Sequence, residues 1–240
     1  MQLTPDGIVY GQIGPLIISA TLVFTWVVAV LLVGLAVLLT RRLTTGAELP
    51  RGQNALEAVV GILRTQIREL SGEEGDAYLP FIGALFLFIA TSNLLAVVPG
   101  FHPPTASLST TVALALCVFV AVPVFGIARR GVRGYLSQYL RPTPLMLPFT
   151  LIGEVSRTVA LAVRLFGNVM SGQLVVGILL TLVPLLFPVA LQILGLITGL
   201  VQAYIFAVLA MVYIASATRV QRERAVAGEA PRPPSHAPGP

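Results

Sequence analysis

Long uncharged apolar runs alternate with short polar segments along this chain. Leu16–Leu39, Leu79–Val98 and Ser109–Ala128 contain no charged residue. Each run, folded as a helix, is long enough to cross the ~30 Å hydrocarbon core of a bilayer. A transmembrane barrel would instead show alternating polar and apolar residues over strands of roughly ten residues. We therefore expect three membrane-spanning helices in the first half of the chain.

Two longer apolar runs follow. Pro148–Val183 would form a helix of about 54 Å and Val189–Ala217 one of about 43 Å, both longer than the hydrocarbon core. Helices that exceed the membrane thickness tilt or break. Pro184 and Pro188 lie between the two runs. The pattern predicts a long tilted hairpin that forms the fourth and fifth crossings.

One segment between the first two crossings has a different periodicity. In Asn54–Leu70, apolar residues recur at spacings of three and four, and Arg64, Arg68 and Glu69 lie between them. Such a pattern is typical of an amphipathic helix. We expect this helix to lie at the membrane interface or against the neighbouring crossings.

These patterns predict an all-α integral membrane protein with five transmembrane helices and one amphipathic interfacial helix. Residues 1–15 form a segment outside the membrane, 16–218 a single helical membrane domain, and 219–240 a disordered inner tail rich in arginine and then proline. The composition agrees, because 56% of the residues are hydrophobic and only 10% charged, against about 25% charged in soluble domains. A soluble enzyme is excluded.

The arginines predict the orientation. With the N-terminus outside and five crossings, the inner segments 40–78, 129–147 and 218–240 contain every arginine except Arg157 and Arg164, and the outer segments contain none. Positive residues concentrate on the cytoplasmic side of membrane proteins. The net charge of +5 does not indicate nucleic-acid binding, because the arginines lie beside crossings rather than in a patch interleaved with aromatic residues.

Charged residues occur inside only one predicted crossing, Pro148–Val183, which contains Glu154, Arg157 and Arg164. A charge at the centre of a bilayer costs about 2.5–3.5 kcal/mol on insertion scales. Glu154 lies three positions before Arg157, which allows an ion pair. On its own helix Arg164 has no such partner, so we expect it to attract a carboxylate of another chain or to repel a cation. A structural contact with carbonyl groups or with Gln202 of the next helix is the alternative.

Further polar residues accompany these charges. Asn168 lies on the helical face of Arg157 and Arg164, whereas Gln173 lies on the opposite face. Gly195 and Gly199 form a GxxxG spacing, which predicts close helix packing. No cluster of histidine, cysteine and carboxylate has metal-ligand spacing, and no phosphate-binding or dinucleotide motif is present. We expect neither a metal nor a cofactor.

Three segments resemble one family. The segments Ala162-Val-Arg-Leu-Phe-Gly-Asn168, Pro104-Thr-Ala-Ser-Leu-Ser-Thr-Thr-Val-Ala-Leu-Ala-Leu116 and Val201-Gln-Ala-Tyr-Ile-Phe-Ala-Val-Leu209 are similar to motifs of subunit a of F-type ATP synthases. The resemblance covers roughly residues 54–217. It implies a membrane stator that is not catalytic by itself. The implied partners are the c-ring, the b subunits of the peripheral stalk, the rest of the F0F1 complex and the bilayer.

The resemblance also implies roles for individual residues. Arg164 becomes the stator arginine, which faces the c-ring and blocks direct ion flow between two offset half-channels. Asn168 and Gln202 match polar positions near it, and Glu154 and Arg157 match positions near the inner half-channel. The implied location is the bacterial inner membrane, in which ion flow through the subunit turns the ring.

The outer half-channel departs from the family pattern. Many relatives carry a carboxylate at Gln173 and an aspartate at Ser107, so the outer path here has non-titrating Gln173, Ser107 and Ser109, with Asn93 as a further candidate. Glutamine cannot ionise, but it can order water or coordinate a cation. Protons are the expected ion and Na+ the alternative. The departure suggests a divergent, second-operon type of rotary ATPase.

Two other interpretations of the intramembrane arginine remain open. An autonomous secondary transporter would use Arg164 to bind an anionic substrate, and internal inverted repeats would favour it. The two halves of the chain show no convincing repeat. A purely structural membrane scaffold would tolerate the substitution Arg164→Gln.

Overall fold

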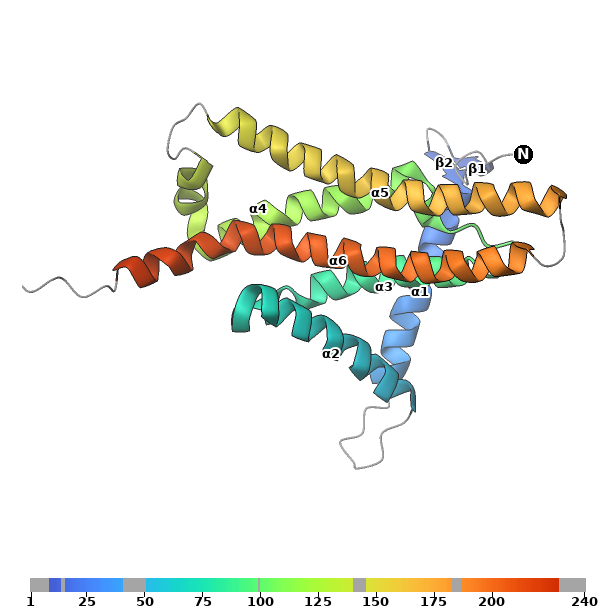
Figure 1. Ribbon diagram of the computed structural model, residues 1–240, viewed down its shortest axis with the longest axis horizontal. Coiled ribbons are helices and arrows are strands. Elements are labelled where there is room, and N and C mark those ends of the chain that lie inside the picture. The colour runs from blue at the N-terminus through green and yellow to red at the C-terminus, as the bar shows by residue number, and fades with distance from the viewer. Residues whose placement is uncertain are drawn as a thin grey trace, which may run out of the picture.

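The computed structural model describes residues 9–13, 16–40, 51–98, 100–139, 146–182 and 187–228 (Figure 1). Its regular structure is helical apart from one ribbon of two short strands. Two short 3-10 helices, η2 (Gly72–Ala77) and η3 (Pro104–Ala106), precede the third and fourth long helices. The long helices are α1 (Ala20–Thr40), α2 (Arg51–Ser71), α3 (Leu79–Leu95), α4 (Leu108–Tyr139), α5 (Met146–Leu182) and α6 (Phe187–Gly228).

The strand ribbon corrects the start of the first crossing. β1 (Val9–Ile13) pairs antiparallel with β2 (Leu16–Ser19), and Ile13 lies opposite Leu16. The sequence predicted that Leu16–Ser19 would begin the first membrane helix. Two β-branched residues, Ile17 and Ile18, favour a strand in this segment, and α1 begins only at Ala20.

Four helices in the described part of the chain are long and apolar enough to cross a membrane. Their apolar stretches are Ala20–Leu38, Leu108–Arg129, Pro148–Thr181 and Val189–Ala217. The remaining predicted crossing corresponds to α3, which is apolar but has only 17 residues. At a rise of ~1.5 Å per residue it is about 25 Å long, near the lower limit for a membrane span.

The two helices α5 and α6 run side by side along the longest dimension of the molecule (Figure 1). With 37 residues, α5 is about 55 Å long at ~1.5 Å per residue. α6 continues to Gly228, beyond the point at which the sequence predicted a disordered tail. The reason is local composition, because 219–228 is rich in arginine, alanine, glutamate and glutamine, which favour helices. Residues 229–240 lie outside the described residues.

α4 extends past the crossing predicted for Ser109–Ala128. It contains Pro123 and reaches Tyr139, but Gly131 interrupts its helical geometry with a φ of 69°. Residues with a side chain rarely adopt this left-handed conformation, which glycine adopts readily. The last part of α4 therefore turns away from the direction of the preceding helix (Figure 1).

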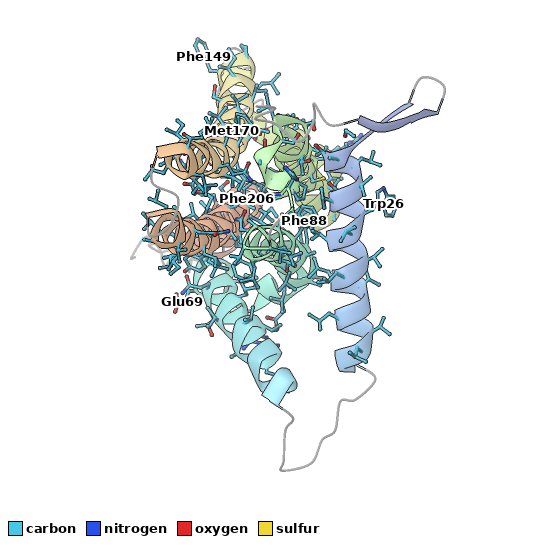
Figure 2. The ribbon with its side chains drawn as sticks, turned by 90° about the vertical axis from the view of Figure 1, so that its right-hand side faces the viewer. Trp26, Glu69, Phe88, Phe149, Met170 and Phe206 are labelled. Atoms are coloured by element: carbon cyan, nitrogen blue, oxygen red, sulfur yellow. The ribbon has the colours of Figure 1, made fainter. Side chains whose placement is uncertain are left out.

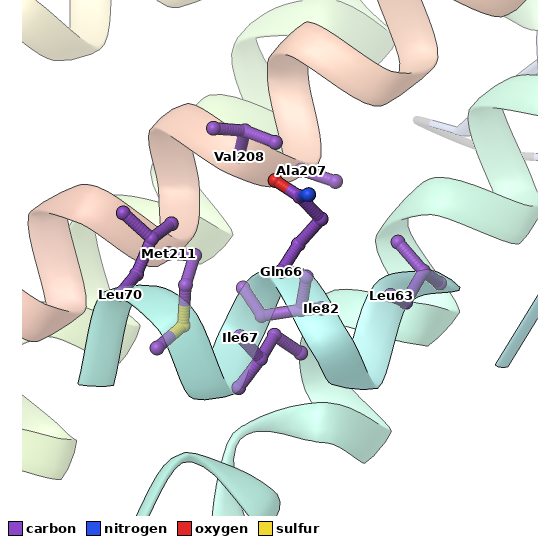
Figure 3. A pocket seen from close by; sticks show the side chains of 8 residues that line it. All are labelled: Leu63, Gln66, Ile67, Leu70, Ile82, Ala207, Val208 and Met211. Carbon is purple, nitrogen blue, oxygen red and sulfur yellow. The ribbon is translucent and has the colours of Figure 1, made fainter. Parts of the chain in front are cut away.

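The predicted amphipathic helix is present as α2. Its apolar face buries Leu63 and Ile67 against α3 and α6. Figure 3 shows a small apolar pocket at this contact, with Gln66 directed from α2 towards Ala207 and Val208 of α6. The contact fits the predicted packing against neighbouring crossings.

The polar face of α2 makes an ion-pair cluster with η2. Arg64 and Arg68 each donate two hydrogen bonds to the carboxylate of Asp76, at donor–acceptor distances from 2.6 to 3.2 Å. The hydrogen bond from Arg64 is the largest cause, and that from Arg68 the next, of a pKa of Asp76 well below its usual range. The cluster fixes the turn between α2 and α3.

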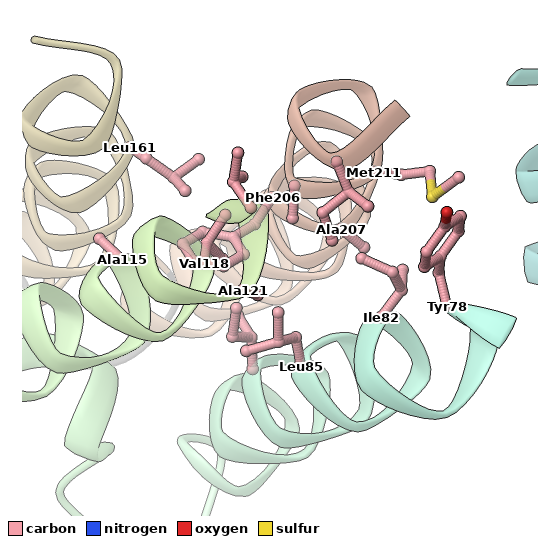
Figure 4. Packing of buried hydrophobic residues seen from close by; sticks show 14 of the residues in the cluster. Tyr78, Ile82, Leu85, Ala115, Val118, Ala121, Leu161, Phe206, Ala207 and Met211 are labelled. Atoms are coloured by element: carbon pink, nitrogen blue, oxygen red, sulfur yellow. The ribbon is translucent and has the colours of Figure 1, made fainter. Parts of the chain in front are cut away.

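The core lies where α3, α4, α5 and α6 meet (Figure 4). Leu85 of α3, Val118 of α4, Leu161 of α5 and Phe206 of α6 are all buried there. Lipid tails are as apolar as these side chains, so close packing rather than removal from water stabilises such contacts. By contrast, Trp26 of α1 points outwards and is 64% exposed (Figure 2).

Candidate functional site

Arg157, Arg164 and Asn168 form one stripe along α5, as their spacings of seven and four residues predicted. The stripe borders the packed face of this helix. Leu161, which lies between the two arginines in sequence, is buried in the core. The backbone geometry therefore brings the two guanidinium groups to the same side of α5, with a rise of about 10.5 Å between their positions.

Arg164 is exposed on α5. Its side chain is exposed, whereas its neighbours Ala162 and Leu165 are buried. Among the residues that the structure describes, Arg164 has no hydrogen-bond or ion-pair partner, so it makes no hydrogen bond to Gln202. Arginines within membrane spans nearly always face the protein interior and pair with other groups. Arg164 thus lies exposed in the apolar stretch Pro148–Thr181, without such a pair among the described residues.

Arg157 contacts an aromatic ring of α6. Its guanidinium carbon lies 5.7 Å from the centroid of the Tyr213 ring, within the distance at which a cation is attracted to an aromatic face. Its spacing from Glu154 predicted an ion pair on α5. The prediction considered only one helix, and the structure adds a contact of Arg157 with an aromatic ring on the neighbouring helix.

Gln202 is a buried member of the predicted set. Its side chain is 6% exposed on α6, and its amide nitrogen Nε2 is buried without a hydrogen-bond partner in the described part of the chain. An unsatisfied buried donor costs about 1–3 kcal/mol. Asn168 and Gln173 are half-buried on α5. Neither side chain forms a hydrogen bond with another described residue.

Ser107 and Ser109 act together at the start of α4. Ser107 is fully buried, and its hydroxyl accepts a hydrogen bond from the backbone nitrogen of Ser109 at 3.2 Å. This is the geometry of a helix N-cap. The two hydroxyl oxygens are 2.6 Å apart. Ser107 therefore has a structural role that its sequence position did not reveal.

Sequence reasoning gave too little weight to Asn93. This residue is 5% exposed at the end of α3, and its amide joins two other parts of the chain. Nδ2 donates to the carbonyl oxygen of Gly199 on α6 at 2.9 Å, and Oδ1 accepts from the hydroxyl of Thr105 at 3.0 Å. The available signal was a polar side chain near the end of an apolar run.

Of the two glycines in the GxxxG spacing on α6, only Gly199 lies in close contact with another described helix. A Cβ atom added at Gly199 would lie 3.0 Å from Cβ of Asn93, whereas one added at Gly195 would meet no atom within 4 Å. Gly167, Gly172 and Gly177 of α5 are equally open. The described residues contain no group of three or more histidine, cysteine or carboxylate side chains that could hold a metal.

The sequence model of the family described as ATP synthase A chain matches residues 22–215. The chain belongs to this family. It is 59% identical over 222 residues to ATP synthase subunit a 2 of Acaryochloris marina, an alignment that covers 92% of this chain and 95% of the relative. ATP synthase subunit a 1 of Chlorobaculum parvum is 57% identical, with 93% and 99% covered. ATP synthase subunit a of Albidiferax ferrireducens is 54% identical, with 95% and 99% covered.

This membership confirms the family to which the three motif segments pointed. The matched region contains all six long helices of the fold, at least in part, and every predicted site residue from Ser107 to Gln202. The apolar helices agree with a membrane subunit of an ATP synthase.

Proposed function

We propose that this chain is the ion-translocating stator subunit of a rotary F-type ATP synthase, and that Arg164 exchanges ions with the carboxylates of a c-ring. The observation that carries the proposal is the exposed guanidinium of Arg164, unpaired among the described residues, in an apolar stretch. The names of the relatives, which are ATP synthase subunits, favour the stator over a secondary transporter.

The chemistry of arginine suits this role. Its guanidinium stays protonated at any physiological pH, so it attracts a passing carboxylate in its deprotonated form and repels free cations. Ions must then travel on the ring to pass from one half-channel to the other. Asn168 and Gln202 line the centre, Gln173, Ser107 and Ser109 the outer half-channel, and Glu154 and Arg157 the inner one.

The arrangement in the membrane follows from the lengths of the helices. Five crossings are proposed, with α3 as the shortest, α2 at the inner interface and the N-terminus outside. In Figure 1, α1 runs across the direction of α5 and α6. If α1 stands upright in the bilayer, the α5–α6 hairpin is strongly tilted, which accommodates helices longer than the ~30 Å hydrocarbon core.

The proposal includes the setting of the subunit. It is a multi-pass protein of a bacterial inner membrane and performs no catalysis itself. Its partners are the c-ring, the b subunits and the remaining F0F1 complex, and the translocated ion is H+, with Na+ as the alternative.

Ion uptake driven by ATP tests the proposal. Proteoliposomes that contain the whole complex are compared for wild type, Arg164→Ala and Arg133→Ala, with proton- and sodium-sensitive dyes and a parallel check of assembly. Arg133 is a matched control because it is also an exposed arginine but lies outside the apolar stretch of α4. We expect Arg164→Ala alone to abolish uptake in assembled complexes. Undiminished uptake would refute the proposal.

A further inference from the structure

The hydrogen bonds of Asn93 connect three parts of the chain that are far apart in sequence. Its amide nitrogen reaches α6 at Gly199, across 106 positions, and its amide oxygen reaches Thr105 in η3. Thr105 is 0% exposed and Asn93 5%. In such a water-excluded place, each hydrogen bond is hard to replace with a bond to solvent.

The contact with α6 depends on the absence of a side chain at residue 199. Cγ and Nδ2 of Asn93 would both lie 3.1 Å from a Cβ atom there. Glycine thus lets the amide come close enough to bond to a backbone carbonyl of another helix. Small residues at helix contacts allow this kind of approach in membrane proteins.

One end of the network lies beside Gln202 of the proposed centre, and the other lies beside Ser107 of the proposed outer path. On α6, Gln202 follows Gly199 by three positions, which is less than one helical turn, and its Nε2 is buried without a partner among the described residues. On the other side, Thr105 is separated by one residue from Ser107, which caps α4 and contacts the Ser109 hydroxyl.

We propose that Asn93 is a positioning residue of the outer ion path, and that it fixes Gln202 and Ser107 relative to each other through Gly199 and Thr105. The inference rests on the proposed function. Both polar atoms of the Asn93 amide are engaged by the protein, so the amide is held in place between α6 and η3, and the proposed role is to hold its neighbours.

Substitutions can separate the two hydrogen bonds. Thr105→Val keeps the size of the side chain and removes the donor to Asn93, whereas Thr105→Ser keeps the donor. Asn93→Ala removes both bonds. Thr111→Val is a matched control, because Thr111 is also fully buried but, among the described residues, its hydroxyl bonds only to the Leu108 carbonyl of its own helix.

The test uses the whole complex in proteoliposomes that make ATP under an imposed ion gradient. The rate is measured against ion concentration on each side separately. We expect Thr105→Val and Asn93→Ala to raise the half-saturating ion concentration on the outer side about fivefold, the factor that corresponds to the ~1 kcal/mol of a typical hydrogen bond. The half-saturating ion concentration on the inner side should be unchanged in every variant. On the outer side it should be unchanged in Thr105→Ser and Thr111→Val.

Other outcomes overturn the inference. A fall in maximal rate without a shift, an equal shift on both sides, or the same shift in Thr105→Ser would show that the hydroxyl does not position the outer path. Failure of Thr105→Val to assemble would show that the network serves folding alone. Arg164→Ala is measured in the same vesicles, because its normal transport would refute the proposed function whatever the Asn93 variants do.

Discussion

The guanidinium of Arg157 on α5 lies over the ring of Tyr213 on α6, with 5.7 Å between the guanidinium carbon and the ring centroid. This contact joins the two long helices at a position about 10.5 Å along α5 from that of Arg164. A cation over an exposed aromatic face contributes about 0.5–1 kcal/mol. The pair therefore stabilises the helix that presents the proposed stator arginine.

Substitution of the ring tests this contact. Tyr213→Phe keeps the aromatic face and should leave thermal unfolding of the purified complex almost unchanged. Tyr213→Leu removes the face and should destabilise the helix pair by about 0.5–1 kcal/mol. A double-mutant cycle with Arg157→Gln should give a coupling energy of that size for residues 157 and 213. A larger coupling between residues 154 and 157 would instead favour the ion pair on α5.

The cluster around Asp76 predicts a loss of stability in acid. Hydrogen bonds from Arg64 and Arg68 hold the pKa of Asp76 below its usual value. A carboxyl group whose pKa is lower in the folded state stabilises the fold fully above its unfolded pKa of ~3.9, and this contribution is lost as the pH falls towards the folded value. Exposed ion pairs contribute little, so the effect should be small.

Asp76→Asn checks this prediction. At pH 7 the variant should unfold at a slightly lower temperature than wild type, and the difference should shrink as the pH falls below about 4. Glu69→Gln is the control, because Glu69 is an exposed carboxylate of α2, the helix that carries Arg64 and Arg68, and no ion pair joins it to another described residue. A difference that does not depend on pH would contradict the linkage to the Asp76 carboxylate.

The two glycines of the GxxxG spacing should respond differently to alanine. Gly199→Ala places a methyl group 3.0 Å from Cβ of Asn93, and overpacking of this kind typically costs about 1–3 kcal/mol. Gly195→Ala meets open space and gains helix propensity of up to about 1 kcal/mol. The temperature of thermal unfolding should therefore be lowered by Gly199→Ala only. Equal effects would mean that the Asn93 contact is not tight.

Long apolar runs predicted most of the helical elements, because a membrane helix is specified by the composition of a single segment. The positions of α5 and α6 agree with the two long runs to within a few residues, apart from the extension of α6 to Gly228. Contacts between helices were harder to predict. Asn93 and Gly199 are 106 positions apart, and no local pattern indicates which carbonyl a buried amide will reach.

The same limit applied to the candidate site. Spacing along α5 placed Arg157, Arg164 and Asn168 on one face, because a helix has a known period. It could not indicate that Tyr213 would lie against Arg157, since that contact depends on how two helices pack. Likewise, the β-branched residues at the start of the first apolar run form β2, paired with β1, although their hydropathy alone suits a membrane helix.

A charge introduced at residue 173 can test the outer ion path. It is half-buried on α5, and among the described residues its amide has no hydrogen-bond partner. A glutamine can order water but cannot take up or release a proton, whereas a glutamate can do both. If residue 173 lies on the outer path, Gln173→Glu adds a titrating group to that path without removing the stator arginine.

We therefore expect Gln173→Glu to retain coupled transport and to change how the rate depends on pH at the outer side only. Gln192→Glu is the matched control, because Gln192 is an exposed glutamine on α6 whose amide reaches the carbonyl of Val97 at 3.5 Å, beside the end of α3. A general effect of negative charge near the outer surface would shift both variants. A shift in Gln173→Glu alone would place residue 173 on the path, and an unchanged pH profile would exclude it.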